Sequence, residues 1–365
     1  MLADSSITRI VHRIVLLADK DEFCWYVCPV TQGGDFEDVF AQMGAQLVKI
    51  PNREKGTWNL SRAVGAYALE NGIDIIHTHT PRTILMAWLA LRGRKQVKHL
   101  TTKHLLTTSS DRKLGFLVAQ FDRMSLALPD RVIAVSEQMG KSIRSFSGVR
   151  KDRVSVIQNA IPVNQFFYPD LREECREEFQ VASNALLIGY TGRIDKVKRI
   201  DLLLSAFCTI LERYPNSVLL IAGEGKLQPQ MKDLAQQMGI AQSVRWTGFR
   251  HDIPRLLAGV DIFVQPSINE GLSLSLLEAM AAKKAVIATK VGGTEEIIRD
   301  GIDGILVEPG SVESLRNALI YLIEDKERRI DMSENAYHTA LENFDLNKNV
   351  ESYYRQYRLL AGSKN

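Results

Sequence analysis

Two glutamates stand eight positions apart in the segment Glu270-Gly-Leu-Ser-Leu-Ser-Leu-Leu-Glu278, which follows the apolar stretch Asp261–Pro266. This order predicts a strand, a glycine-containing turn and then a helix. If the helix begins near Ser273, its free backbone N–H groups point to the mouth of a sheet, where phosphate groups bind. Eight residues are a little over two helical turns, so the two carboxylates could accept hydrogen bonds from the two ends of one ligand. A helix start with one capping and one solvated glutamate explains this segment equally well by itself.

Two cations follow an earlier predicted strand. The segment Tyr190-Thr-Gly-Arg193 ends that strand, and Lys198 stands five residues further on, before a helix that begins at Ile200. Gly192 lets the backbone approach a ligand closely, and Arg193 and Lys198 can neutralise a diphosphate from two sides. An ordinary turn with solvent-facing cations is the competing interpretation.

Three more glycine-bearing turns end predicted strands in the same half of the chain, at Ile221–Gly225, Val244–Phe249 and Val291–Ile297. The turn at Gly248 and Phe249 exposes backbone where a nucleotide base could be read. The carboxyl ends of parallel strands share one edge of a sheet, so we expect these turns, the two cations and the two glutamates to meet there. The combination predicts a site for a nucleotide-diphosphate sugar.

The chain as a whole predicts an α/β protein with two domains. Its 365 residues, 45% of them hydrophobic, are enough for two cores. Short apolar strands alternate with amphipathic helices, which indicates two doubly wound, Rossmann-like domains with parallel sheets, facing across a cleft. We expect the first domain at residues 1–163, the second at 164–345 and a last helical segment at 346–365. The expected strands are Phe23–Val30, Gln46–Ile50, Ile73–His77, Gln96–Thr102, Arg131–Ala134, Val154–Ile157, Leu186–Tyr190, Ser217–Ala222, Ser243–Trp246, Asp261–Pro266, Ala285–Thr289 and Gly304–Val307.

Several features bear on compartment and cofactors. No apolar run is long enough to span a bilayer, and the first residues do not read as a secretory signal. The D-x-D triplet Asp19-Lys-Asp21 lies far from the predicted site in sequence, so we expect no metal. The cysteines show no metal-ligand spacing, which fits a reducing cytoplasm; they are Cys24, Cys28, Cys175 and Cys208. We therefore expect a cytoplasmic protein.

Charge is unevenly distributed. Residues 1–169 carry 22 Lys and Arg against 15 Asp and Glu, a net +7, whereas residues 170–365 carry 24 against 28, a net −4. Basic residues concentrate between Arg92 and Lys113. This favours an anionic partner, either a phosphate-bearing ligand or an acidic membrane at the inner face of the cell, although a solvated surface explains most of these residues as well. No basic–aromatic interleaving indicates nucleic acid as a partner. The basic residues of this region are Arg92, Arg94, Lys95, Lys98, Lys103, Arg112 and Lys113.

The order of these motifs resembles that of the retaining family 4 glycosyltransferases of GT-B fold. The resemblance covers about residues 72–360 and is carried by Thr191-Gly-Arg193, Lys198, Gly223-Glu-Gly225, Gly248-Phe249, the two glutamates and Gly292-Gly293. It implies transfer of a sugar from a UDP- or GDP-sugar donor to a lipid-linked, polysaccharide or other glycan acceptor. It also implies retention of anomeric configuration, no cofactor beyond the donor substrate and no metal.

The resemblance assigns a role to each matching residue. Arg193 and Lys198 would grip the donor diphosphate, and Glu270 would contact the hydroxyls of the transferred sugar. Glu278 would bind the ribose, and the loop at Gly248 and Phe249 would touch the base. Backbone N–H groups of the turn and helix start would hold sugar and phosphate; these belong to Gly271, Leu272, Ser273 and Leu274.

The first half carries fewer readable motifs. His77, His79 and His104 fall at predicted strand ends, and His104 resembles the family's histidine near the reacting sugar. A structural role competes for His77 and His79. The segment Asn347–Leu360 resembles the family's final helix, which crosses back onto the first domain.

The start of the chain departs from the family pattern. Relatives open with a strand and a Gly-Gly loop, whereas this sequence opens with an apolar helical pattern at Ile7–Leu17, and Gly33-Gly34 follows the next strand. We expect the first domain to lack its first strand through a shortened recorded sequence; a start at an internal methionine or a protein without that strand are the alternatives. Three functions therefore stay open: the glycosyltransferase described above, a sugar-nucleotide epimerase or transferase to a small sugar phosphate, and a catalytically degenerate nucleotide-sugar-binding subunit.

Overall fold

The computed structural model describes residues 6–30, 36–50, 56–105 and 113–362. The chain forms two compact units, one of Met1–Asn159 with Leu346–Asn365 and the other of Ala160–Asp345. We call them the first and the second unit, and each is described by itself. The division falls a few residues before the predicted one at residues 163 and 164. Within the described part of the chain, no helix is both long and apolar enough to cross a membrane.

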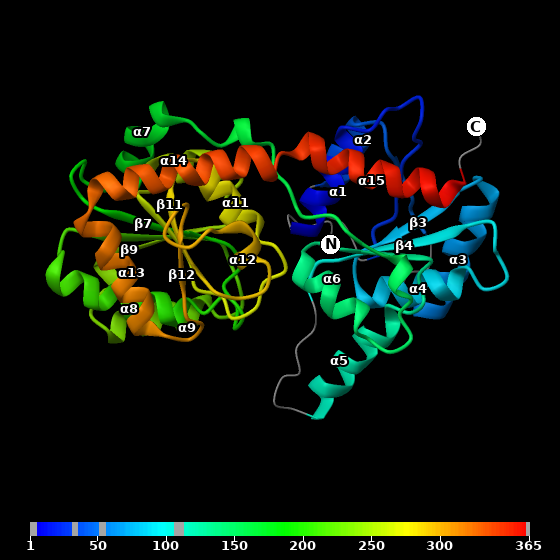
Figure 1. Cartoon of the computed structure of the whole chain (residues 1–365), viewed down its shortest axis with the longest axis horizontal. Coiled ribbons are helices and arrows are strands. Elements are labelled where there is room, and N and C mark those ends of the chain that lie inside the picture. The colour runs from blue at the N-terminus through cyan, green and yellow to red at the C-terminus, as the bar shows by residue number, and fades with distance from the viewer. Residues whose placement is uncertain (1–5, 31–35, 51–55, 106–112, 363–365) are drawn as a thin grey trace. The chain divides into compact units, whose positions relative to one another are not determined.

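The second unit contains a six-stranded parallel sheet in the order β12-β11-β10-β7-β8-β9 (Figure 1). Its central strands are short apolar runs buried on both faces, as the near-continuous hydrophobic pattern predicts. The order reverses between β7 and β10, and in open α/β sheets this switch point is where ligands bind. The strands are β7 (Leu187–Thr191), β8 (Val218–Ala222), β9 (Val244–Gly248), β10 (Ile262–Gln265), β11 (Ala285–Thr289) and β12 (Ile305–Val307).

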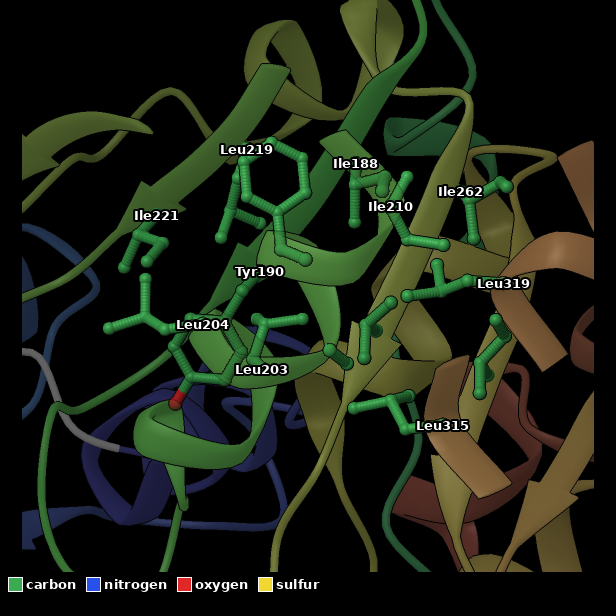
Figure 2. Packing of buried hydrophobic residues seen from close by; sticks show 14 of the residues in the cluster. Ile188, Tyr190, Leu203, Leu204, Ile210, Leu219, Ile221, Ile262, Leu315 and Leu319 are labelled. Carbon is green, nitrogen blue, oxygen red and sulfur yellow. The ribbon is translucent and has the colours of Figure 1, made fainter. Parts of the chain in front are cut away.

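Helices cover both faces of this sheet. Figure 2 shows Leu203 and Leu204 of α8 packed with Tyr190 and Ile221, in one cluster with side chains of β7, β8, β10 and α13. Helices α10, α11 and α14 contact β7, β10 and β11. The helices of the unit are α7 (Arg172–Glu178), α8 (Ile200–Arg213), α9 (Gln228–Gln237), α10 (Ile253–Gly259), α11 (Leu274–Ala281), α12 (Thr294–Ile297), α13 (Val312–Glu324) and α14 (Lys326–Asn343).

The apolar pattern did not predict two of these helices, α7 and α14. Helix α7 is almost wholly charged, with the sequence REECREE. Helix α14 buries only a narrow stripe that includes Met332, Ala336 and Ala340. Small or polar residues on a thin buried face give a weak helical period, so tertiary packing rather than pattern decides these two segments.

The first unit has two parallel sheets among its described residues, β3-β4-β5-β6 and β1-β2. The strands predicted at Phe23–Val30 and Gln46–Ile50 shrink to the pair β1 (Tyr26–Val27) and β2 (Gln46–Leu47), which form a two-stranded sheet in the described part of the chain. The apolar residues beyond them, Val48 and Ile50, are buried without extending the strand. The other strands are β3 (Ile75–Thr78), β4 (Lys98–Lys103), β5 (Arg131–Ala134) and β6 (Val154–Val156).

The last helix, α15 (Leu346–Ala361), belongs to the first unit. It buries Tyr353, Tyr354 and Tyr357, and the Tyr354 hydroxyl donates to the carbonyl oxygen of Ile14 at 2.7 Å. This bond ties the end of the chain to α1. The other helices of the unit are α1 (Ser6–Leu16), α2 (Phe36–Gln42), α3 (Thr57–Glu70), α4 (Pro81–Ala90), α5 (Lys113–Ser125) and α6 (Glu137–Arg144).

One residue of the predicted basic region is not on the surface. Lys103, at the end of β4, is buried and forms an ion pair with Asp122 of α5. Burial lowers the pKa of Lys103, and the hydrogen bond with the Asp122 carboxylate opposes that shift. Lys103 therefore cannot meet an anionic partner, and that part of the interpretation was wrong. Residues 106–112 and the Lys113 side chain lie outside the described part of the chain.

Candidate functional site

The glycine turns of the second unit pack against one another at the carboxyl edge of its sheet. A Cβ atom added to Gly223 would lie 1.9 Å from the carbonyl oxygen of Gly192, and one added to Gly292 would lie 1.8 Å from that of Glu270. The Gly192 amide donates to Ala222, the last residue of β8. These positions need glycine because backbone approaches backbone too closely for any side chain. The predicted meeting of these turns at one edge is confirmed.

Glu270 and Lys198 form an ion pair at this edge. The Lys198 Nζ atom lies 2.6 Å from Glu270 Oε1, and the two side chains are 16% and 9% exposed. Lys198 follows β7 and Glu270 follows β10, so 72 residues of sequence separate them. They meet because β7 and β10 are neighbours in the sheet, at the point where the strand order reverses.

Gln265, the last residue of β10, orients Glu270. Its Nε2 atom donates to Glu270 Oε1 at 2.5 Å, and its Oε1 atom accepts from the Ser273 hydroxyl at 2.8 Å. Gln265 and Ser273 are buried, so this chain of bonds fixes the Glu270 carboxylate from the side opposite solvent. We did not single out Gln265 from the sequence; its position at a strand end, five residues before Glu270, was the available signal.

Helix α11 begins where the sequence predicted. Ser273 is its N-cap and accepts a hydrogen bond from the Leu276 amide. The carbonyl of Gly271 accepts from the Gly293 amide, which ties this turn to the glycine turn after β11. Glu278 lies on the second turn of α11 and is buried, at 2% exposure. One carboxylate therefore stands just before the helix and the other inside it.

Arg193 behaves differently from Lys198. Its side chain is 74% exposed and its guanidinium lies 3.2 Å from Asp195. Asp195 also accepts from the amides of Val197 and Lys198, which shapes the turn that presents Lys198. The structure therefore holds Lys198 against Glu270 and leaves Arg193 at the surface of the same turn.

An aromatic side chain stands at the end of β9. Phe249 is 41% exposed, and its ring meets that of His251 edge-on at 4.7 Å. Its amide donates to Glu224 Oε1 at 3.3 Å, which links the turn after β8 to the turn after β9. An exposed ring at a strand end can stack on a nucleotide base. Glu224 was present in the Gly223-Glu-Gly225 motif, but we gave only its glycines a role.

The first unit contains a connected group of histidines. His79 Nδ1 lies 3.0 Å from His104 Nε2. His77 contacts the Tyr357 hydroxyl with one ring nitrogen and the Thr102 hydroxyl with the other, both at 2.8 Å. His77 thus has the satisfied, structural environment that was one of its two interpretations.

His104 uses only one of its two ring nitrogens in a hydrogen bond within the described part of the chain. Its Nδ1 atom is buried and has no hydrogen-bond partner among the described residues. Burial lowers the pKa of His79 to about 4 and holds the pKa of His104 well below its ordinary value. Both rings are therefore neutral near pH 7, and a neutral imidazole can donate to or accept from a hydroxyl group. The bond between His79 and His104 follows from the pairing of β3 with β4, and we did not predict it.

Two family descriptions match this chain. "Glycosyltransferase Family 4" matches residues 16–165, and "Glycosyl transferases group 1" matches residues 172–339, so together they span most of both units. The chain belongs to the family 4, group 1 glycosyltransferases and is a transferase enzyme.

Individual proteins are also similar to this chain in sequence or in structure. The chain is 28% identical, over 84% of its length, to N-acetyl-alpha-D-glucosaminyl L-malate synthase of Bacillus anthracis, of which it covers 80%. It is 25% identical, over 76% of its length, to UDP-Gal:alpha-D-GlcNAc-diphosphoundecaprenol alpha-1,3-galactosyltransferase of Escherichia coli, of which it covers 73%. Anabaena HepE, solved in complex with UDP-glucose, superposes with a TM-score of 0.84 at 21% identity, covering 98% of each chain. The predicted family and the GT-B fold are confirmed.

Proposed function

We propose that this enzyme transfers a sugar from a UDP- or GDP-sugar to a lipid-linked, polysaccharide or other glycan acceptor, with retention and with no metal ion. The observation that carries the proposal is the ion pair between Lys198 and Glu270 at the switch point of the second unit. A cation and a carboxylate held together suit the two ends of a diphosphate sugar, since the cation binds phosphate and the carboxylate binds hydroxyls.

The leaving group sets the electrostatic demand. Cleavage of the bond between sugar and phosphate places negative charge on the departing diphosphate. Lys198 supplies a positive charge that is held in place, and Arg193 supplies a second one at the surface of the same turn. The N–H groups of the α11 start, from Gly271 to Leu274, add the positive end of a helix dipole. Glu270 would accept hydrogen bonds from sugar hydroxyls, while Gln265 keeps its carboxylate in place.

The remaining contacts concern the nucleoside and the hydroxyls of the reacting sugar. Phe249 offers an exposed ring to the base, and Glu278 would bind the ribose. In the first unit, His104 is a candidate hydrogen-bonding group through its resemblance to the family's histidine, and its Nδ1 atom has no partner among the described residues. Because burial keeps this ring neutral, we assign it hydrogen bonding rather than charge stabilisation.

The names of relatives point to different acceptors, one of them lipid-linked and two of them small molecules. These relatives are the N-acetyl-alpha-D-glucosaminyl L-malate synthase, the diphosphoundecaprenol galactosyltransferase and a D-inositol 3-phosphate glycosyltransferase. Because inositol phosphate is small and phosphorylated, the last of these relatives supports transfer to a small sugar phosphate as the second candidate function. We propose a cytoplasmic enzyme that works at the inner face of the cell membrane.

A ligand panel tests the donor first. Thermal unfolding with UDP, GDP and their sugars should show a selective rise in Tm for one nucleotide, because a ligand that binds only the folded state stabilises it. Incubation of that donor with lipid extract, glycans or sugar phosphates then identifies the product class. Epimerised donor without transfer would favour the epimerase, and binding without turnover under every acceptor would favour a degenerate subunit.

Two substitutions connect activity to the site. Lys198→Ala and Glu270→Ala should abolish transfer while leaving the fold intact. Glu324→Gln is the matched control, because α13 runs back from the carboxyl edge and ends with Glu324 paired to Arg213 at the end of α8. Normal turnover in both site variants would show that the site is wrongly assigned.

A further inference from the structure

Helix α5 of the first unit turns apolar side chains outward. Phe116 and Leu117 are each 62% exposed and Met124 is 63% exposed. Val118 and Phe121 are exposed on the same helix. Soluble proteins place single apolar residues at the surface routinely, but they rarely gather five on one short helix without a partner for them.

The buried side of α5 carries the polar group instead. Ala119, Asp122 and Ser125 are buried at a spacing of three residues, which marks the side that faces the unit. Asp122 is the one acidic residue of the helix, and it pairs inside with Lys103. The helix therefore has the reverse of the usual pattern, in which charged residues face solvent and apolar ones face the core.

The surroundings of α5 are basic. Helix α4 packs against α5, and its partly exposed Trp88 lies under the guanidinium of Arg92, 5.2 Å from the ring centroid. Arg123, on α5 itself, is exposed and lies over the ring of Phe146. Among the described residues from Trp88 to the end of α5, Asp122 is the only acid. In Figure 1, α5 lies at the periphery of its own unit.

We propose that α5, with Trp88, Arg92 and Arg123 around it, is a docking surface for an anionic lipid membrane. Aromatic and aliphatic side chains on one face of a helix bury into the boundary of headgroups and acyl chains, and flanking arginines attract anionic headgroups. Tryptophan is a residue that favours this boundary. Membrane docking is argued from α5 and its surroundings. Its consequence, that the acceptor is carried by a membrane, rests on the proposed glycosyltransferase function.

Charge favours lipid over a second copy of the chain. A symmetric dimer through α5 would place the same basic surface of each copy against the other, including Arg92 and Arg123, and like charges across an interface oppose association. An anionic membrane has the opposite sign. It also covers a single convex helix without needing a complementary groove.

Vesicle sedimentation of the full chain tests the proposal. The wild-type chain should sediment with vesicles of phosphatidylglycerol and phosphatidylcholine and much less with phosphatidylcholine alone, and added salt should weaken binding. The double variant Leu117→Glu/Phe121→Glu should bind the anionic vesicles at least roughly tenfold more weakly, because each change removes buried apolar area and adds a repelled charge. Ile330→Glu, at a half-exposed position of α14 in the second unit, is the matched control and should bind as wild type.

Further measurements separate the alternatives. Both residues of the double variant are exposed, so its Tm and its nucleotide-induced Tm shift should match wild type; Lys198→Ala should lose that shift and keep vesicle binding. A double variant that loses vesicle binding but retains the nucleotide-induced Tm shift would therefore show that α5 acts in membrane binding and not in nucleotide binding. Wild-type binding that ignores lipid charge, or a double variant that binds normally, would overturn the proposal. So would a wild-type dimer in light scattering that the double variant converts to monomer, with no vesicle binding by either.

Discussion

Replacing Glu270 by glutamine should separate affinity for the nucleotide from affinity for its sugar. In the structure, Glu270 neutralises Lys198 at 2.6 Å and accepts a second bond from Gln265. The substitution removes the negative charge while preserving the size of the side chain. Lys198 is then a cation without its carboxylate, so we expect UDP or GDP alone to bind more tightly. The sugar portion loses its carboxylate acceptor, so it should add less affinity than before.

The magnitude follows from the number and kind of bonds. A hydrogen bond that involves a charged group contributes about 1.5–3 kcal/mol. Glutamine keeps an amide oxygen that still accepts, in a neutral hydrogen bond worth about 0.5–1.5 kcal/mol. Each hydroxyl bond should therefore weaken by about 1–1.5 kcal/mol, which lowers the ratio of sugar-nucleotide affinity to nucleotide affinity by about 5- to 13-fold. The gain for the nucleotide alone should be smaller, because Lys198 is 16% exposed and water already screens part of its charge.

Isothermal titration of the nucleotide and of its sugar conjugate into the wild type, Glu270→Gln and Glu324→Gln measures both effects. The ratio should change only in the Glu270 variant, since Glu324 carries the same charge at the opposite end of its helix from the binding edge. A Glu270→Gln enzyme whose ratio stays within about twofold of wild type would refute the reasoning. A nucleotide affinity that falls in this variant would show that Glu270 does not compete for Lys198.

Three other changes test separate parts of the structure. Phe249→Ala should weaken nucleotide binding by about 1–3 kcal/mol in the same titrations, through lost stacking on the base, and equal affinity would place the base elsewhere. Lys103→Met should lower the free energy of unfolding in urea by about 3–5 kcal/mol, because Asp122 is left charged and buried. The double variant Lys103→Met/Asp122→Leu should recover most of that loss. A Lys103→Met variant as stable as wild type would contradict this expectation. The pKa of His79 is about 4 in the folded chain against an ordinary value of 6.5, so protonation of His79 opposes folding. The contribution of neutral His79 to the free energy of unfolding is therefore complete above pH 6.5. It is lost as the pH falls towards 4, by up to about 3 kcal/mol. A change from about pH 7 to about pH 5 should therefore lower the Tm of His79→Gln less than that of wild type. Parallel plots of Tm against pH for the two proteins would show that His79 is not responsible for the loss of stability.

The elements that the sequence predicted well are those with a strong local period. Strands such as β7 and β11 are continuous apolar runs, and α8 has a clear apolar face, so their neighbours in sequence are enough to define them. Helices α7 and α14 lack that period and were missed. The strands at β1 and β2 were overextended, because Val48 and Ile50 are apolar and buried although β2 ends at Leu47.

The site divides in a similar way. The glycine turns, Lys198 and Glu270 were predicted as one site because parallel strands share a carboxyl edge. Their direct contact was not predicted, and neither was Gln265, since both depend on β10 lying beside β7.

The sequence by itself determined the alternation of strands and helices, the family, and the residue types at the binding edge. These follow from local period and from turns that only glycine can form. Only the tertiary structure decided that Lys198 pairs with Glu270, that Lys103 is buried with Asp122, and that the apolar side of α5 faces outward. Each of these depends on which segments become neighbours in space, and a helix with apolar residues on more than one side does not reveal from its sequence which side the rest of the fold will cover.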